Sequence, residues 1–406
     1  MDNIEVPEYF ICPISLQIMK DPVTAITGIT YDRECIEHWL FEFEGENMIC
    51  PVTKQALPKD SDLTPNHTLL RLIQAWCITN ASMGIDRIPT PKPPLNKFHV
   101  LNLVKGLWVP KLQLKTLKKL EVLAMENERN MKYMVEAGVV KAMVTFIIAC
   151  YKKKETTGLE EALSILHLLR SVEKKIVQDE NCQIIDALKW VLECDWDNKV
   201  TVKNHAVLLL KTITGKADSG VLERLKVEFF ERIIQVLREG ISQQGIKAAL
   251  QVLLDACPWG RNRIMMVETG AVFQLIELEL GSPENRTTEL ILGVLFHLCS
   301  CADGRAQLLS HAGGIAVITK RILNVSPAAD DRAMMIISLI CKFSGTSWVL
   351  QEMLRVGTIT KLCMVLQVDC ASYLKDKARE ILRTHSNVWK NSPCVDAPVL
   401  TRYSSS

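Results

Sequence analysis

The pattern of apolar and polar positions changes at about residue 98. From His99 onward, apolar residues recur at spacings of three and four, which predicts a succession of amphipathic helices. Within this pattern a short helix, a glycine and a longer apolar helix recur, with the glycines at Gly138, Gly270, Gly314 and Gly357. The first interval is 132 residues, or three periods of 44, and the next two are 44 and 43 residues. A repeat of this length predicts an α-solenoid of armadillo or HEAT units.

Two positions in this register lack the glycine but keep the apolar helix that follows. They fall near Cys182 and Lys226. The sharp glycine turn between a short and a longer helix favours armadillo repeats over HEAT repeats. We therefore expect a solenoid of about six armadillo repeats over residues 99–392, followed by a disordered tail over residues 393–406.

The first eighty residues have a different pattern, typical of a small α+β domain. Two β-prone runs flank Thr27 and Gly28, which predicts a hairpin. Two helices follow, one with Ile36, Trp39, Leu40 and Phe43 on its buried face, and one near residues 68–79. The second helix is expected to bury Leu69, Leu72, Ile73 and Trp76. We place this domain at residues 5–80 and expect a long loop over residues 44–65.

Residues 81–98 contain four prolines within six positions and are predicted to be an extended, semi-stiff linker. The charge also differs across this linker. Residues 1–80 hold five Lys or Arg against twelve Asp or Glu, a net charge of −7, whereas the rest of the chain carries +9. Two modules with different partners fit this asymmetry, and the overall charge of +2 argues against a general nucleic-acid binder.

The fourteen cysteines show no framework spacing, and the acidic N-terminus lacks the apolar core of a secretory signal. Reduced thiols and a cytoplasmic location are therefore expected, with the nucleus as the alternative. The longest apolar run, near residues 290–302, is too short to span a bilayer, which needs about 20 residues.

Two cysteines begin segments that resemble half of a zinc motif. Cys12-Pro13-Ile14-Ser15 and Cys50-Pro51-Val52-Thr53 each place a hydroxyl residue where a paired zinc ligand would have a second cysteine. A neutral hydroxyl is not a structural zinc ligand, so we expect no metal and no cofactor. We interpret Cys12, Cys35, His38 and Cys50 as small buried packing residues. The alternative is that these four side chains form a zinc site. Without zinc, hydrogen bonds and ion pairs among groups such as Ser15, Asp21, Arg33, Thr53 and Lys54 must hold the loops.

The same segments resemble a known family. Residues 10–23 are similar to the opening of a U-box, the zinc-free relative of the RING finger, and further blocks match in order at residues 28–33, 36–40, 50–54 and 63–69. The resemblance implies a domain that docks a ubiquitin-conjugating enzyme. It implies that the docking residues are Ile14, Leu16, Trp39, Pro51 and Lys54, although an arginine is the stronger choice at the Lys54 position. The structural residues of the domain are then Cys12, Pro13, Ser15, Asp21, Val23, Tyr31, Arg33 and Thr53.

A U-box followed by armadillo repeats resembles the plant U-box ubiquitin ligases. The fold class expected is mainly α, with a small α+β U-box preceding the solenoid. The resemblance implies a RING-type ubiquitin transferase that positions a ubiquitin-charged conjugating enzyme without forming a covalent intermediate of its own. It also implies that the solenoid binds a protein substrate, with turnover in stress or immune signalling, and it allows a homo-oligomer through the U-box. The alternative is a non-catalytic armadillo adaptor with a degenerate U-box.

Many peptide-binding armadillo proteins hold the ligand backbone with asparagines on the last helix of each repeat. The helices after the glycine positions contain no such series of asparagines. They do carry basic residues at a similar phase, which predicts a basic strip as a substrate groove, with an ordinary solvated face as the alternative. The strip consists of Lys189, Arg232, Lys320 and Lys361.

Overall fold

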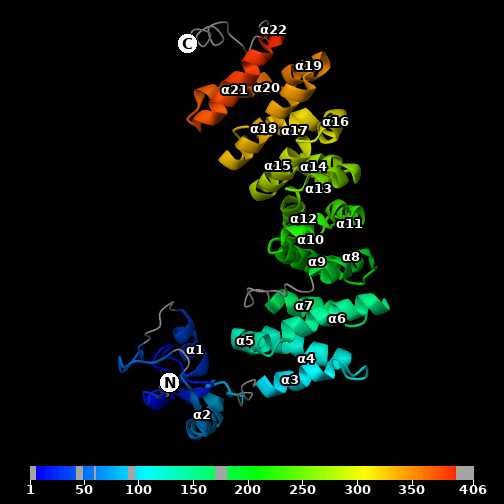
Figure 1. Ribbon diagram of the computed structural model, residues 1–406. Helices are drawn as coiled ribbons and strands as arrows, with labels where there is room; N and C mark the ends of the chain where they lie inside the picture. The colour runs from blue at the N-terminus through cyan, green and yellow to red at the C-terminus, as the bar shows by residue number, and fades with distance from the viewer. Residues whose placement is uncertain (1–5, 43–48, 59–60, 90–96, 170–180, 390–406) are drawn as a thin grey trace. The chain divides into compact units, whose positions relative to one another are not determined.

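The structure, a computed structural model, describes residues 6–42, 49–58, 61–89, 97–169 and 181–389 (Figure 1). The chain divides into two compact units, Met1–Pro94 and Leu95–Ser406. The predicted tail over residues 393–406 and Phe43 lie outside the described residues.

The first unit is a small α+β domain with a three-stranded antiparallel sheet. The strand order is β2-β1-β3, with Val23 paired to Tyr31 in β2 and to Pro65 in β3. Its elements are η1 (Glu8–Phe10), β1 (Pro22–Thr24), β2 (Thr30–Asp32), α1 (Arg33–Glu42), β3 (Thr64–Pro65), α2 (His67–Thr79) and η2 (Ala81–Met83).

The predicted hairpin is confirmed, with Gly28 at φ +80° in its turn. The third strand, β3, lies inside the segment predicted to be a loop. A two-residue strand carries no alternation of its own, so only pairing to β1 defines it. Asn66 then starts α2: its side chain accepts a hydrogen bond from the Leu69 amide at 3.0 Å.

The core of this unit lies between the sheet and the two helices. Ile36 and Leu40 are buried as predicted, and Ile73 is buried on α2. Leu72, however, is 52% exposed, and Leu70 and Cys77 are buried in its place. The predicted linker also begins as part of this unit, because Ile85 and Ile88 pack against the core and Gln74 donates a hydrogen bond to the Ile88 carbonyl at 3.2 Å.

The second unit is an α-solenoid (Figure 1). Its helices are α3 (Lys97–Gly106), α4 (Gln113–Glu126), α5 (Glu128–Glu136), α6 (Val139–Lys153), α7 (Leu159–Leu169), α8 (Asn181–Glu193), α9 (Lys199–Thr214), α10 (Ser219–Glu223), α11 (Val227–Glu239), α12 (Gln243–Ala256), α13 (Gly260–Glu268), α14 (Ala271–Leu280), α15 (Asn285–Cys299), α16 (Ala302–Ser310), α17 (Gly314–Arg321), α18 (Pro327–Ser344), α19 (Ser347–Arg355), α20 (Thr358–Gln367), α21 (Ser372–Thr384) and α22 (Ser386–Trp389).

The repeating unit is a short helix, a second helix and a third helix, as in α13, α14 and α15. The helices after the glycine positions, predicted to be the last of each repeat, are the second ones: α6, α8, α11, α14, α17 and α20. That prediction is wrong, because another amphipathic helix follows each of them. The third helices, α7, α9, α12, α15, α18 and α21, pack on one another more closely than the second helices do, and in Figure 1 they form the inner row of the curved solenoid.

The glycine turns have two physical explanations. Gly138, Gly270 and Gly357 have φ between +77° and +80°, the left-handed conformation that glycine adopts most readily. Gly314 does not share this conformation. A Cβ there would lie 2.0 Å from the carbonyl oxygen of Leu308, so the close approach of the preceding helix requires glycine at this position.

Candidate functional site

Two surface loops of the first unit share one backbone geometry. In the first, the Cys12 amide donates to the Gln17 carbonyl at 2.8 Å and the Leu16 amide donates to the Cys12 carbonyl at 2.9 Å. The second loop repeats both bonds around Cys50, at 2.8 and 3.0 Å. The fourth residue after each cysteine, Leu16 or Lys54, has a positive φ of 56° or 59°. Side chains other than glycine rarely adopt this conformation, so both loops hold strain at their tips.

The two buried thiols act as hydrogen-bond acceptors within these loops. The Cys12 sulfur accepts from the Asp32 amide at 3.3 Å. Burial opposes ionisation of this thiol, but donors from Ser15, Asp32 and Ile14 outweigh burial and lower its pKa. Hydrogen bonds to this thiol therefore help to hold the first loop in place.

Cys50 is held in the same way by more donors. Its sulfur lies 3.3 Å from Thr27 Oγ1, 2.9 Å from the Tyr31 hydroxyl and 3.5 Å from the Thr53 amide. Burial raises the pKa of the thiol, and these hydrogen bonds more than compensate and lower it to about 6. The pKa of Tyr31 is raised, first by burial and then by the neighbouring Cys50.

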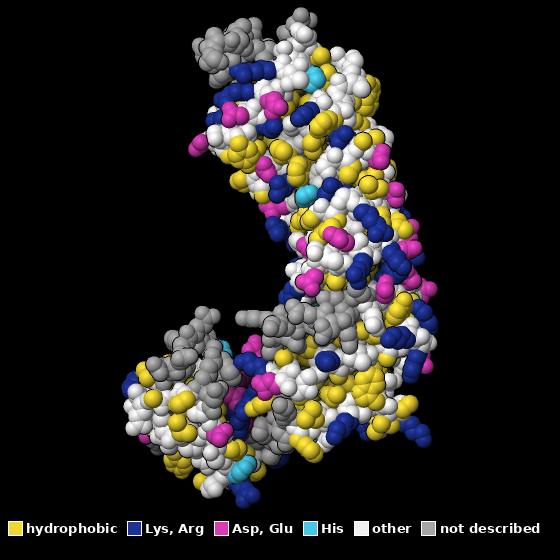
Figure 2. Space-filling view, in the orientation of Figure 1, with side chains coloured by type: hydrophobic (Ala, Val, Ile, Leu, Met, Phe, Trp, Pro, Cys, Tyr) yellow, Lys and Arg dark blue, Asp and Glu magenta, His cyan; other side chains and the backbone are white. Residues whose placement is uncertain are grey.

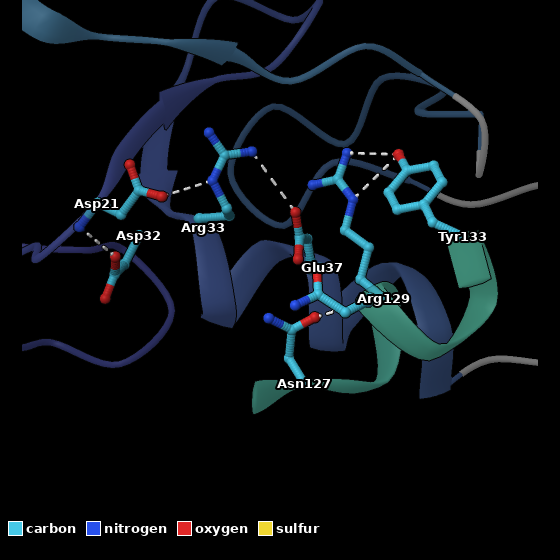
Figure 3. A network of polar contacts seen from close by, with 8 residues as sticks. Asp21, Asp32, Arg33, Glu37, Asn127, Arg129 and Tyr133 are labelled. Carbon is cyan, nitrogen blue, oxygen red and sulfur yellow. Dashed lines mark hydrogen bonds and ion pairs between the residues drawn. The ribbon is translucent and has the colours of Figure 1, made fainter. Parts of the chain in front are cut away.

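An ion-pair cluster lies beside the first loop. Figure 3 shows Asp21 and Glu37 on either side of the Arg33 guanidinium, with Nε of Arg33 at 2.5 Å from Asp21 Oδ2 and Nη1 at 3.6 Å from Glu37 Oε1. The Asp21 amide also donates to Asp32 Oδ1 at 2.9 Å. Three successive residues, Tyr31, Asp32 and Arg33, therefore contact Cys50, Cys12 and Asp21, so the end of β2 and the start of α1 hold both loops.

The predicted docking residues lie on or beside these loops. Leu16 is 76% exposed at the tip of the first loop, and Lys54 is exposed at the matching position of the second. Ile14 and Pro51 are half-buried, and Ile14 packs against the core. Trp39 is half-buried on α1, and its indole Nε1 donates to the Ile49 carbonyl at 3.2 Å where the second loop begins.

Two apolar residues of the second loop were absent from the predicted docking set. Ile49 and Val52 are each 49% exposed. Val52 occupies the place in its loop that Ile14 occupies in the first, two residues after the cysteine. Comparing the two sequences position by position would have found it, because Cys12-Pro13-Ile14-Ser15 and Cys50-Pro51-Val52-Thr53 have the same order of residue types.

Some predicted structural residues are placed differently from expectation. Val23 and Tyr31 are fully buried, as expected of core residues. Pro13 and Ser15 are exposed, although the Ser15 hydroxyl still contributes a hydrogen bond to Cys12. Thr53 is half-buried, and its hydroxyl accepts from the Gln55 amide at 3.4 Å.

The packing explanation for the cysteines and His38 needs correction. His38 is exposed on α1 and so is not a core residue. Cys12 and Cys50 are buried, but they also accept hydrogen bonds, whereas Cys35 is half-buried. Among the described residues there is no group of three or more His, Cys, Asp or Glu side chains that could hold a metal ion.

The four basic residues of the predicted strip lie on second helices: α8, α11, α17 and α20. Arg232 pairs with Glu193 at 3.2 Å, and Lys361 Nζ donates to the Ile322 carbonyl at 3.0 Å. Lys189 lines a cavity of about 250 Å³ beside Phe229, and Lys320 is exposed. They lie on a different row from the inner, third helices, and two of the four are engaged within the solenoid.

The inner row also lacks a series of asparagines. Within the third helices that the structure describes, α7 to α21, the asparagines are Asn204 on α9 and Asn285, the first residue of α15. Two asparagines on two of the helices do not make a ladder along the groove. An asparagine series is therefore missing from the third helices as well as from the second helices for which its absence was predicted.

The fold and the two loops define a class of protein: a small RING-like domain joined to an armadillo-type solenoid. The chain matches the U-box domain over residues 6–82 and the plant U-box protein ARM repeat region over residues 99–405. It therefore belongs to the plant U-box E3 ubiquitin ligases with ARM repeats, and its enzyme class is RING-type ubiquitin transferase.

Relatives in Arabidopsis thaliana match along nearly the full chain. The E3 ubiquitin-protein ligase PUB24 is 43% identical, over 99% of this chain and 96% of the relative, and PUB23 is 42% identical, over 99% and 98%. A chain from a structure on the interaction between cadherin and beta-catenin has a TM-score of 0.57 at 13% identity, covering 78% of this chain and 58% of that one. This structural likeness supports the solenoid fold alone.

Proposed function

We propose that the two loops and Trp39 form the docking site for a ubiquitin-conjugating enzyme charged with ubiquitin. The observation that supports this most is the paired loop geometry. Tyr31 and Asp32 of β2 hold one loop each, both loops present apolar side chains to solvent, and Trp39 of α1 is hydrogen-bonded to the second loop. A rigid, partly apolar surface of this kind fits a protein partner.

Catalysis then works by positioning, because the thioester of the conjugating enzyme already supplies the reactive bond. The ligase holds that enzyme and its ubiquitin in an attack-ready geometry, and this chain supplies no nucleophile. Lys54 lies at the tip of the second loop, where its ammonium group can hydrogen-bond both proteins. Since an ammonium lacks the planar fork of arginine, Lys54→Arg is expected to increase the transfer rate.

Self-ubiquitination with a panel of conjugating enzymes tests the docking site. Ile14→Ala and Trp39→Ala should each reduce the rate about ten-fold or more, as expected for central interface residues. Leu72→Ala removes an exposed apolar side chain from α2, away from the two loops, and should leave the rate unchanged. Wild-type rates from the Ile14 and Trp39 variants would refute the site. Inactivity of the unmodified protein with every conjugating enzyme would instead support the adaptor alternative.

We further propose that the inner row of third helices selects the protein substrate, with proteasomal turnover as the outcome. A concave solenoid surface provides an extended area for a protein ligand. Exposed lysines allow a direct comparison of the two rows: Lys211 and Lys342 lie on third helices, whereas Lys320 lies on a second helix.

Substrates can be captured by proximity labelling with the Trp39→Ala variant, which should bind substrates without turning them over. Lys211→Glu with Lys342→Glu should reduce capture, and Lys320→Glu should not. The reverse result would favour the basic strip on the second helices. Accumulation of the captured proteins on proteasome inhibition checks the proposed turnover.

A cytoplasmic site of action and a role in stress or immune signalling are proposed from the family resemblance. Imaging of a fluorescent fusion tests the location, with the nucleus as the alternative, and loss of the gene tests the role through altered stress or immune responses. Homo-oligomerisation through the U-box stays a prediction, which sedimentation of the purified protein would check.

A further inference from the structure

The first two helices of the solenoid carry an unusual combination of exposed apolar and basic side chains. Residues 97–126 contain six lysines against two glutamates, Glu121 and Glu126, and no arginine or aspartate. The exposed apolar residues include aromatic ones at 70% and 51%, for Phe98 and Trp108. We call the following exposed residues of α3, the connecting segment and α4 the basic apolar face: Phe98, Trp108, Val109, Leu112, Val122 and Met125, with Lys105, Lys111, Lys115, Lys118 and Lys119.

This face is the outer side of the terminal helices. On α4, Thr116, Leu117, Leu120 and Ala124 are buried against the solenoid, and the opposite side carries the exposed lysines together with Val122 and Met125. The end repeats of a solenoid normally present a polar outer face to water. In Figure 2, yellow and dark blue side chains lie together at the end of the solenoid where Figure 1 places α3 and α4.

The five exposed lysines carry unneutralised charge. Within the described part of the chain, none of them forms an ion pair with an acidic residue. A second copy of the same face would therefore be repelled, because an isologous contact would bring two sets of lysines together. An occupant must combine negative charge with a surface that accepts aromatic and aliphatic side chains.

We propose that the basic apolar face binds the surface of an anionic phospholipid membrane. Two features favour a membrane over an acidic protein. All the cations are lysines, which protein interfaces disfavour relative to arginine, and aromatic side chains of the kind that enter the headgroup region lie between them in the sequence. Lysine stems can extend to lipid phosphates while Trp108 and Phe98 enter the interface. Binding is proposed to be peripheral. Within the described residues, no single helix is long and apolar enough to span a bilayer. The helices α5 and α6 have the necessary length and composition only as a pair, and they are bent by 70° relative to each other.

Co-sedimentation of the full chain with vesicles tests this proposal. The protein should bind vesicles of phosphatidylcholine with phosphatidylserine at low salt, bind poorly to phosphatidylcholine alone, and dissociate as salt rises. Each lysine near an anionic surface strengthens binding about five-fold, so Lys111→Glu with Lys115→Glu and Lys118→Glu should weaken it more than about 100-fold. Lys152→Glu with Lys153→Glu and Lys226→Glu reverses three exposed charges elsewhere on the solenoid and should change binding less than about five-fold.

Trp108→Ala with Phe98→Ala should weaken binding at high salt more than at low salt, because it removes the apolar part of the interaction. Circular dichroism and self-ubiquitination in solution should be unchanged in every variant, which separates membrane binding from folding and from the docking site. Equal binding by the two lysine variants would overturn the proposal, and so would absence of binding to anionic vesicles. Capture of an acidic protein that requires this face, without vesicle binding, would likewise overturn it in favour of a protein partner.

Discussion

The ion pair between Glu279 and Arg321 gives a sharp test of how the solenoid is held together. Glu279, on α14, is fully buried, and its Oε1 contacts Arg321 Nε from α17 and accepts from Thr288 Oγ1 at 3.0 Å. Arg321 also donates to the Glu279 backbone carbonyl at 3.1 Å, a bond that survives loss of the side chain. The pair therefore links consecutive repeats in the interior.

The Glu279→Ala variant should destabilise these repeats by about 4 kcal/mol. About 3 kcal/mol comes from leaving the buried Arg321 charge without its carboxylate, and about 1 kcal/mol comes from the unpaired Thr288 hydroxyl. Replacing both partners, as Glu279→Leu with Arg321→Met, should recover most of this loss, because no uncompensated charge then remains. The exposed pair of Lys377 and Glu380 is the control, and Glu380→Gln should cost at most about 0.5 kcal/mol.

Urea unfolding followed by circular dichroism measures the free energy. Hydrogen exchange in α14 and α17 shows whether the loss is local, since solenoid repeats need not unfold together. The reasoning would be refuted if Glu279→Ala cost less than about 1 kcal/mol. It would also be refuted if the variant with both Glu279→Leu and Arg321→Met lost as much free energy of unfolding as the two single substitutions added together.

Four further predictions concern the U-box. Leu16→Gly should raise stability by about 1 kcal/mol, because glycine adopts the positive φ without strain. It should also lower self-ubiquitination, because it removes the exposed side chain. Lower stability of this variant would contradict the inference that the backbone is strained at Leu16. The pKa of Cys50 is lowered to about 6 in the folded protein, so its thiolate adds stability as the pH rises from 6 towards the unfolded pKa near 9, and this stability is lost as the pH falls through 6. Cys50→Ala should flatten this rise when the free energy of unfolding is measured as a function of pH. Asp21→Asn should cost about 2 kcal/mol by weakening the charged bond to Arg33, measured by thermal unfolding. Trp39→Phe loses the bond to the Ile49 carbonyl, about 1 kcal/mol, but keeps apolar contact, so it should retain more ligase activity than Trp39→Ala.

Much of the fold is predictable from periodicity. Ile36, Leu40 and Ile73 follow the helical pattern into the core, and the 44-residue period predicts a solenoid. The prediction that Leu72 is buried is wrong, because an amphipathic pattern defines the buried face of a helix only to within about one residue. Tertiary packing in this domain buries the face of α2 that carries Leu70 and Cys77 instead. The third helix of each repeat is harder to assign, because the glycine marks the start of the second helix and nothing comparable marks the third.

The candidate docking site shows a different limit of prediction from sequence. Leu16 and Lys54 could be located from the spacing after each cysteine, but their positive φ values depend on backbone bonds that no residue pattern records. The exposure of His38 and the acceptor role of the thiols likewise depend on where β2 lies. Val52 was within reach of sequence reasoning, since the two loops have the same order of residue types.

The two loops are held differently from the way a zinc ion would hold them. A zinc ion joins its ligands through one central atom, whereas here consecutive residues of one backbone serve as the joint. The Tyr31 hydroxyl reaches Cys50, the Asp32 amide reaches Cys12, and Arg33 pairs with Asp21 at the end of the first loop. Because these donors belong to adjacent residues, movement of one loop is transmitted through the strand to the other. The relative position of the loops is therefore set by β2 and the first turn of α1.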